Sequence, residues 1–267
     1  MSKIFCLSLI WSFLFSHTAD HLVFVKVVTL PTEGEMVAIH NPTSADIDLS
    51  DYYITDATDI GKVYYNLPSN ENYWSESSRD FIARFPADYI IASGDTITLG
   101  LHDMQTYREH FNEKPDLALF EDMRNAVDNT ITIGKGPEGA INYSMLTEAN
   151  EVLILFKWDE TDPIVEDIDY FLWGTNNYAI SKSIDGGYSF NDASIENQKP
   201  IREYIPKTYP DIMDSAYMRT GLEETDEFSS GNGITGHDET SENFSSNWEI
   251  VLQKEIILGC TDKAAPN

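Results

Sequence analysis

Residues 22–56, LVFVKVVTLPTEGEMVAIHNPTSADIDLSDYYITD, decide the fold of this chain. The segment VFVKVV is apolar on both faces, and residues 36–40 form a returning strand after the turn PTEG. A second turn, NPTS, leads to Ile47 and Leu49, which alternate with polar residues in the period of two that is typical of a half-buried strand. Residues 52–54 begin another strand. The sequence therefore predicts consecutive short β-strands joined by tight turns.

The rest of the chain continues this pattern of short apolar segments between turns. The segment EVLILFKW is apolar on both faces, which is typical of a strand buried inside a sheet. Polar, turn-rich stretches separate the strands and predict surface loops at residues 66–80, 174–212 and 221–247. We expect strands at residues 81–85, 89–91, 96–101, 130–133, 151–158, 164–173, 214–220 and 248–258.

Residues 102–127 interrupt the strand pattern with a helical period. Met104, Tyr107 and Phe111 have helical spacing, and a second set with the same spacing follows Pro115. We expect an inserted pair of helices that covers one end of a β-sandwich and contributes to its core.

The composition limits the class of partner. The chain has 267 residues, 42% of them hydrophobic and 12% aromatic, so it can build a substantial core. Its formal net charge of −28 repels nucleic acids and anionic lipid surfaces, so we expect no nucleic-acid partner. An acidic surface favours divalent cations or basic partners, and it also serves simply to keep a protein soluble.

The N-terminus is typical of a secretory leader. Lys3 precedes an apolar run at residues 4–15, and we expect cleavage between Ser16 and Ala19, with residues 1–19 as the leader. Cys6 lies inside the apolar run rather than at its end, which argues against a lipoprotein site. No later stretch reaches transmembrane length. We therefore expect an exported protein without a transmembrane segment in the mature chain, located extracellularly, at the cell surface or in the periplasm.

Four blocks of this sequence, taken in order, resemble the bacterial lamin tail domain, a small immunoglobulin-like β-sandwich. The first block is GEMVAIHNP followed by DLS and YITD, and the ordered set of four blocks is more specific than any one of them. The others are residues 85–86 with 93–97, residues 151–155 with 167–174, and residues 215–219 with 241–244. The resemblance covers residues 20–257. It implies an all-β, immunoglobulin-like β-sandwich of lamin-tail type, here with the helical insertion at about residues 102–127.

The sequence departs from the family pattern at three places. Ala38 stands where the family often has an acidic residue, residues 102–127 are additional, and Leu258-Gly259 replaces the closing Thr-Pro-Gly. These departures concern the edges of the expected sandwich more than its core. The resemblance implies no catalytic residues. The family also occurs beside secreted nucleases and phosphatases, so the chain could be an accessory domain of such a hydrolase.

The last residues, 258–267, form a separate tail. GCTDKAAPN resembles the start of a Cys-containing repeat of surface proteins, in which a later cysteine supplies the partner thiol. Cys260 is the lone cysteine after the leader, so it is a free thiol, half of an intermolecular bond, or the first half of a pair completed further along a longer chain.

The sequence offers no convincing catalytic constellation, so we expect a protein that is not an enzyme. The histidines are scattered and form no His-Glu-x-x-His motif, and His237 lies in a polar, glycine-rich stretch. No Gly-x-Ser-x-Gly elbow and no phosphate-binding loop occurs. An active site in the 221–247 loop remains the enzymatic alternative.

Calcium is the best candidate for a cofactor. Hard cations bind several carboxylate and carbonyl oxygens on loops, and six acidic residues lie close together in the sequence around one turn. The candidate ligands are Asp159, Glu160, Asp162, Glu166, Asp167 and Asp169. The alternative is a charged rim that keeps sheet edges from pairing.

Aromatic residues offer a candidate ligand-binding platform. Tyr73 and Trp74 lie in a polar loop, where they could stack against a glycan. Together these observations predict a non-enzymatic, exported or cell-surface module that binds a protein or glycan or serves as a structural unit.

Overall fold

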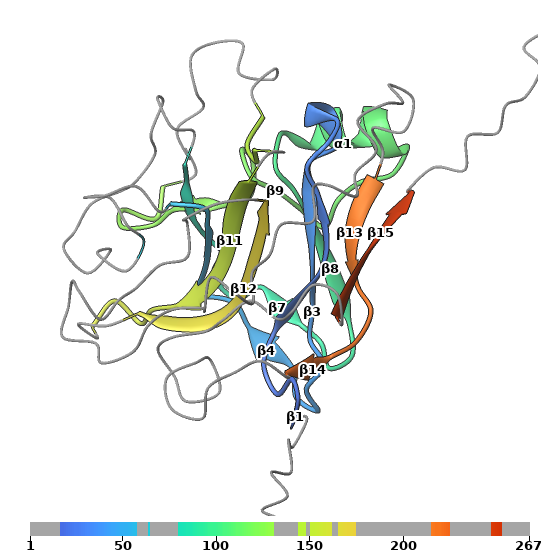
Figure 1. Cartoon of the computed structure of the whole chain (residues 1–267). Helices are drawn as coiled ribbons and strands as arrows, with labels where there is room; N and C mark the ends of the chain where they lie inside the picture. The colour runs from blue at the N-terminus through green and yellow to red at the C-terminus, as the bar shows by residue number, and fades with distance from the viewer. Residues whose placement is uncertain are drawn as a thin grey trace, which may run out of the picture.

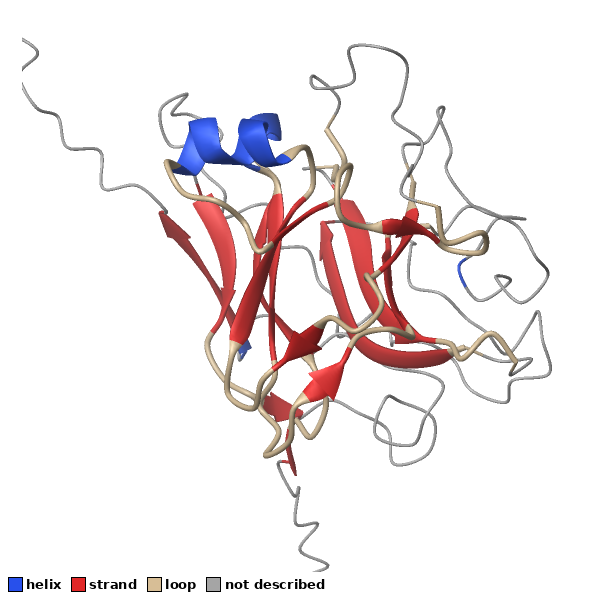
Figure 2. Cartoon of the chain, turned by 180° about the vertical axis from the view of Figure 1, so that it is seen from behind, coloured by secondary structure: helices blue, strands red, loops and turns tan. Residues whose placement is uncertain are grey.

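A computed structural model describes residues 17–57, 64, 80–130, 144–147, 150–161, 165–174, 215–224 and 247–252. The regular secondary structure of this part of the chain is mostly β-sheet, with one α-helix and one 3-10 turn, in line with the all-β class that the sequence predicted (Figures 1 and 2). The elements are β1 (His17–Thr18), β2 (Val23–Val28), η1 (Thr32–Gly34), β3 (Met36–His40), β4 (Ile47–Asp48), β5 (Tyr52–Thr55), β6 (Ile82–Arg84), β7 (Ile90–Ile91), β8 (Thr96–Gly100), α1 (Met104–Phe111), β9 (Leu117–Ala118), β10 (Arg124–Asn125), β11 (Asn150–Lys157), β12 (Glu166–Gly174), β13 (Ser215–Arg219), β14 (Glu223–Glu224) and β15 (Trp248–Leu252).

Two large sheets form two layers (Figure 1). The six-stranded sheet has the order β15-β13-β2-β3-β8-β9, and the five-stranded sheet has the order β10-β6-β5-β11-β12. Their strand pairs are antiparallel except for β8 with β9, which run parallel. Two short ribbons, β1 with β14 and β4 with β7, complete the described strands.

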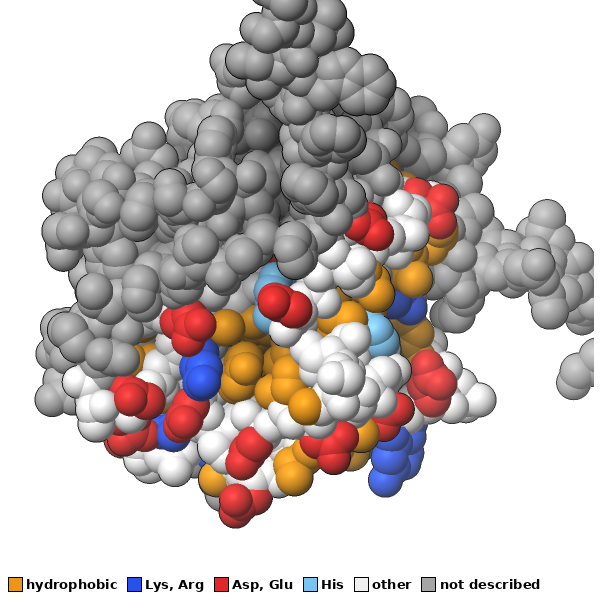
Figure 3. All heavy atoms as spheres, turned by 90° about the horizontal axis from the view of Figure 1, so that it is seen from below, with side chains coloured by type: hydrophobic (Ala, Val, Ile, Leu, Met, Phe, Trp, Pro, Cys, Tyr) orange, Lys and Arg blue, Asp and Glu red, His pale blue; other side chains and the backbone are white. Residues whose placement is uncertain are grey.

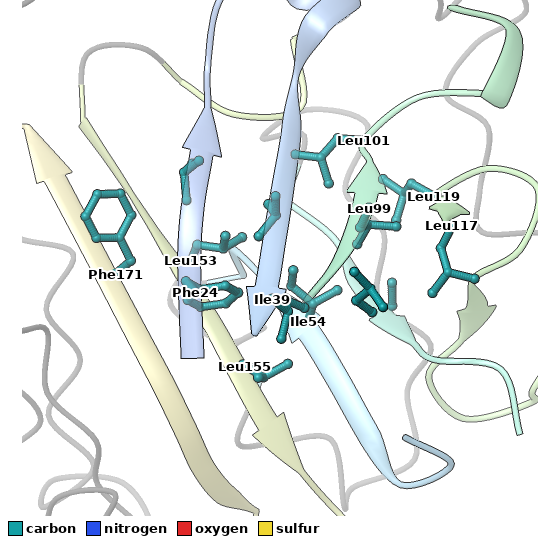
Figure 4. Packing of buried hydrophobic residues seen from close by; sticks show 14 of the residues in the cluster. Phe24, Ile39, Ile54, Leu99, Leu101, Leu117, Leu119, Leu153, Leu155 and Phe171 are labelled. Atoms are coloured by element: carbon teal, nitrogen blue, oxygen red, sulfur yellow. The ribbon is translucent and has the colours of Figure 1, made fainter. Parts of the chain in front are cut away.

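The facing sides of the two sheets share one apolar core (Figure 4). Phe24, Ile39 and Leu99 point inward from the six-stranded sheet, while Ile54 and Leu153 point inward from the five-stranded sheet. These side chains alternate with outward-facing ones along β3, β5, β8 and β11, as the period-two pattern requires. In β2 a register shift after Phe24 makes Val27 the next inward residue. The hydrophobic core therefore specifies the strand register on both sheets.

The five-stranded sheet is also buried on its outer side. Val152, Ile154 and Phe156 of β11 belong to a second apolar cluster that includes Tyr64 and Tyr170. Because β11 is apolar at every position from Val152 to Phe156, it is buried on both faces. This confirms the interpretation of that segment as a strand inside a sheet.

The first helix expected in the 102–127 region forms as α1. Asp103 caps its N-terminus by accepting a hydrogen bond from the Thr106 amide at 2.8 Å, and Asn112 ends it in the left-handed conformation with φ of 59°. Tyr107 packs over Gly100, where an added Cβ would lie 2.9 Å from the ring. Figure 2 shows the helix at one end of the strands.

The second expected helix does not form. Residues 117–118 are strand β9 and residues 124–125 are strand β10. Asp116 accepts hydrogen bonds from the Thr98 amide at 2.7 Å and hydroxyl at 2.9 Å, which fastens the chain to the edge of β8. Leu117 and Met123 reach the inter-sheet core from this extended path, so their helical spacing reflected burial rather than a helix.

Candidate functional site

Two of the predicted calcium ligands, Asp167 and Asp169, lie on opposite faces of β12. A register shift opposite Leu155 and Phe156 turns Ile168 and Asp169 to the same inner side. Asp167 faces outward, where its carboxylate accepts a hydrogen bond from the Tyr64 hydroxyl at 2.8 Å. Both carboxylates are almost fully buried. The strand therefore separates two residues that the sequence places together.

Asp169 joins the two sheets. Its carboxylate accepts a hydrogen bond from the Phe24 amide of β2 and lies 3.4 Å from the Arg219 guanidinium of β13. Arg219 also donates to the Gly221 carbonyl at 3.0 Å and lies over the Trp248 ring at 6.0 Å. The charged pair is buried on both sides, so it is a polar crosslink inside the core.

The other predicted calcium ligands lie in or near the turn after β11. Asp159 accepts hydrogen bonds from the amide and hydroxyl of Thr161, both at 2.9 Å. Glu160 adopts a left-handed φ of 66° and pairs with Arg84. Glu166 begins β12 and is half-buried, while Asp162 lies outside the described residues. Among the residues that the structure describes, no group of three or more histidine, cysteine or acidic side chains is arranged to hold a metal. Calcium binding stays a prediction.

The remaining sequence-predicted positions lie outside the described residues. These are Tyr73, Trp74, His237, Cys260 and residues 1–16.

Glu35 is the centre of a buried polar cluster that sequence reasoning missed. Its side chain is 1% exposed and accepts hydrogen bonds from the Met145 amide at 2.6 Å and from His102 Nε2 at 3.1 Å. Ser144 Oγ also donates to it, and the Leu146 amide lies 3.4 Å away. Burial raises the pKa of Glu35, while these donors oppose that effect. The carboxylate thus fastens residues 144–146 to the start of β3.

His102 completes this Glu35 cluster. The ring is 2% exposed and packs edge-on against Phe120, with 6.1 Å between ring centroids. Because Nε2 lies against the Glu35 carboxylate, it carries the proton in the neutral tautomer. Nδ1 is buried and makes no hydrogen bond to any residue that the structure describes. The histidine orients the carboxylate and adds a donor to it, which is a structural role.

A second acidic cluster lies at one end of the five-stranded sheet. Asp56, at the end of β5, is almost fully buried and accepts a hydrogen bond from the Phe81 amide at 2.6 Å. Burial raises the pKa of Asp56 well above its usual range, and the negative charges of Glu151 and Asp80 raise it further. Burial also raises the pKa of Glu151 to about 7. These carboxyl groups therefore hold protons more strongly than exposed carboxyl groups do.

The sequence marked some residues of these buried clusters, but it did not predict which residues they contact. Glu35, Asp56 and Arg219 all occur in the blocks that resemble the lamin tail domain, whereas His102 is ordinary in type and spacing. Glu35 and Ser144 are 109 residues apart in the chain. Their contact depends on the fold, and no local pattern in the sequence encodes it.

No helix within the described ranges is long and apolar enough to cross a membrane. No protein-family model matches the chain, and no curated protein matches it. Among solved structures, the chain is similar to a DUF4876 family protein from Bacteroides thetaiotaomicron, with 13% sequence identity over 90% of this chain and 74% of that chain. The TM-score is 0.44. At that level, the comparisons assign the chain to no family and to no function.

Proposed function

We propose that this chain is an exported, non-enzymatic module with an immunoglobulin-like β-sandwich of the lamin-tail type, which serves as a binding or structural unit at the cell surface or outside the cell. One observation carries the proposal: buried ionisable side chains are used to join parts of the fold. Asp169 and Arg219 connect the two sheets, and Glu35 connects three segments. A catalytic acid or base must instead reach its substrate.

The motif residues of the first block support the lamin-tail type because they have structural roles. Asn41 donates to the Ala45 carbonyl at 2.8 Å and to the Ile91 carbonyl at 3.0 Å, which shapes the turn after β3. Asp48 accepts hydrogen bonds from the amide and hydroxyl of Ser50, and Leu49 is fully buried in the shared core. These are the contacts expected where a motif specifies a scaffold.

The contacts of residues 17–19 bear on where the expected leader would be cleaved. His17–Thr18 pairs with β14, and the Ala19 amide donates to the Leu222 carbonyl at 2.7 Å. Cleavage after Ala19 would remove this ribbon, whereas cleavage between Ser16 and His17 would keep it. The proposal therefore places the mature N-terminus at His17.

Expression of the full chain from Met1 in a bacterium tests the proposal. The expected result is protein outside the cytoplasm whose intact mass and N-terminal peptide begin at His17. A second arm assays the purified protein against a broad panel of hydrolase substrates. Uncleaved protein confined to the cytoplasm would contradict export. Hydrolase activity that is lost in His237→Ala would contradict the non-enzymatic role.

A further inference from the structure

The ribbon formed by β4 and β7 presents an isoleucine to solvent. Ile47 pairs with Ile91, and Asp48 pairs with Ile90. Ile91 is buried in the shared core, whereas Ile90 is 57% exposed. Within the described ranges, Ile90 is the large hydrophobic side chain that stands out as exposed.

The surroundings of Ile90 are acidic. Asp48 lies directly across the ribbon, Asp88 comes two residues before Ile90, and Asp46 begins the approach to β4. All three are exposed. Residues 41–56 and 85–95 contain no lysine or arginine. Hydrogen bonds from Ser50 hold the pKa of Asp48 below its usual range, so this carboxylate stays charged. Figure 3 shows a face of the molecule on which hydrophobic side chains gather with acidic, basic and histidine side chains around them.

A single exposed isoleucine is common on protein surfaces, but this one is held in a rigid frame. The Ser93 amide donates to Asp46 at 3.0 Å, and the Asp88 amide donates to the Ser50 hydroxyl at 2.8 Å. The Ser93 hydroxyl donates to the Thr43 carbonyl at 2.6 Å. A surface that is already ordered loses little conformational entropy when a partner binds.

We propose that this acidic surface, Ile90 with Asp46, Asp48 and Asp88, docks a cationic peptide segment of another protein that combines lysine or arginine with an aliphatic or aromatic side chain. Opposite charges would attract the segment and set its register, and its apolar side chain would cover Ile90. A second copy of this chain is a poor occupant, because each copy carries a net charge of −28. This inference rests on the proposed role as a binding module and names its partner class.

The test uses the full chain and two labelled peptides of equal length and charge. One peptide alternates lysine with leucine, and the other alternates lysine with serine. The variants are Ile90→Ser and the triple variant Asp46→Asn, Asp48→Asn, Asp88→Asn. Asparagine keeps the oxygen that accepts the hydrogen bonds of Asp46 and Asp48, and it tolerates the left-handed φ of 60° at Asp88. The matched control removes three charges elsewhere, by Asp20→Asn, Glu109→Gln and Glu249→Gln, and circular dichroism checks the fold of every variant.

The lysine-leucine peptide is expected to bind more tightly than the lysine-serine peptide, measured by fluorescence anisotropy at low and high salt. Ile90→Ser should weaken its binding about tenfold and abolish the difference between peptides. The triple variant should weaken binding and flatten its salt dependence, and the control should do so much less. Equal losses of affinity in the triple variant and the control would show that the whole acidic chain attracts the peptide, and would refute this docking surface. Failure of both peptides to bind would also refute it. The proposed function is tested separately by export and hydrolase activity, so it would not fail with the docking surface.

Discussion

Replacing Glu35 with methionine tests whether the buried carboxylate stabilises the fold through its hydrogen bonds. Methionine has a similar length and no strong hydrogen-bond acceptor, so it fills the space of Glu35 without accepting the hydrogen bonds of its neighbours. The Met145 amide and His102 Nε2 would then be buried donors without an acceptor. Ser144 Oγ would keep its bond to the Leu146 carbonyl.

The expected loss of stability follows from these two donors. Each buried donor left without a partner costs about 1–3 kcal/mol, so the pair costs about 2–6 kcal/mol. The Glu35 carboxylate is almost fully buried, so it loses solvation in the fold, and this burial raises its pKa. Removing the carboxylate also removes the free-energy cost of burying it, which offsets part of the loss from the two donors. The net loss in the free energy of unfolding should be about 3 kcal/mol, a large share of the stability of a typical domain.

Urea unfolding followed by tryptophan fluorescence measures this loss. Glu35→Gln keeps one carbonyl acceptor and should cost only about 1 kcal/mol. Glu33→Met, at an exposed neighbour, is the matched control and should change the midpoint little. If Glu35→Met were as stable as the unchanged protein, the side chain would act by packing alone and the hydrogen-bond argument would be wrong.

Three further predictions concern other parts of the molecule. Burial raises the pKa of Glu151 from 4.5 to about 7, so the stability that its proton contributes is complete below pH 4.5 and is lost as the pH rises through 7. This loss is at most about 3 kcal/mol. Urea midpoints measured across this pH range should show it, and Glu151→Gln should make the midpoint depend less on pH. Millimolar calcium should raise the melting temperature relative to chelator, and Asp159→Asn should reduce that shift; a calorimetric scan without any shift would refute the prediction. Gly34→Ala should lower the melting temperature because the added Cβ would lie 2.7 Å from the His110 ring, and His110→Ala should restore it in the double variant.

Strand positions could be predicted well from the sequence because their apolar periodicity reports burial directly. The segments at residues 22–28, 36–40 and 96–101 form strands β2, β3 and β8, as their apolar patterns predicted. The pattern at Leu117 and Met123 failed for the same reason. The spacing shows only that these side chains are buried. The backbone is extended there because Asp116 hydrogen-bonds to Thr98 of β8 and the chain continues along that strand as β9.

The candidate calcium ligands show what the sequence could not predict. Asp167 and Asp169 are neighbours in the chain, yet the bulge at Ile168 directs them to opposite faces of β12. Their partners, Tyr64 and Arg219, are 103 and 50 residues away along the chain. A prediction from local charge has no access to such partners.

The order of strands in the six-stranded sheet has a mechanical consequence. Strand β13 lies between β2 and β15 and is antiparallel to both, so β2 and β15 run in the same direction. The start of β2 and the end of β15 are therefore at opposite ends of the sheet (Figure 1). Tension applied at these two points would pull the strands along their length. It would load the hydrogen bonds of β2–β13 and β13–β15 together in shear, instead of breaking them one after another. A module tethered between a cell and its surroundings would resist extension through this arrangement, because forced unfolding is governed by the rate at which the whole ladder breaks.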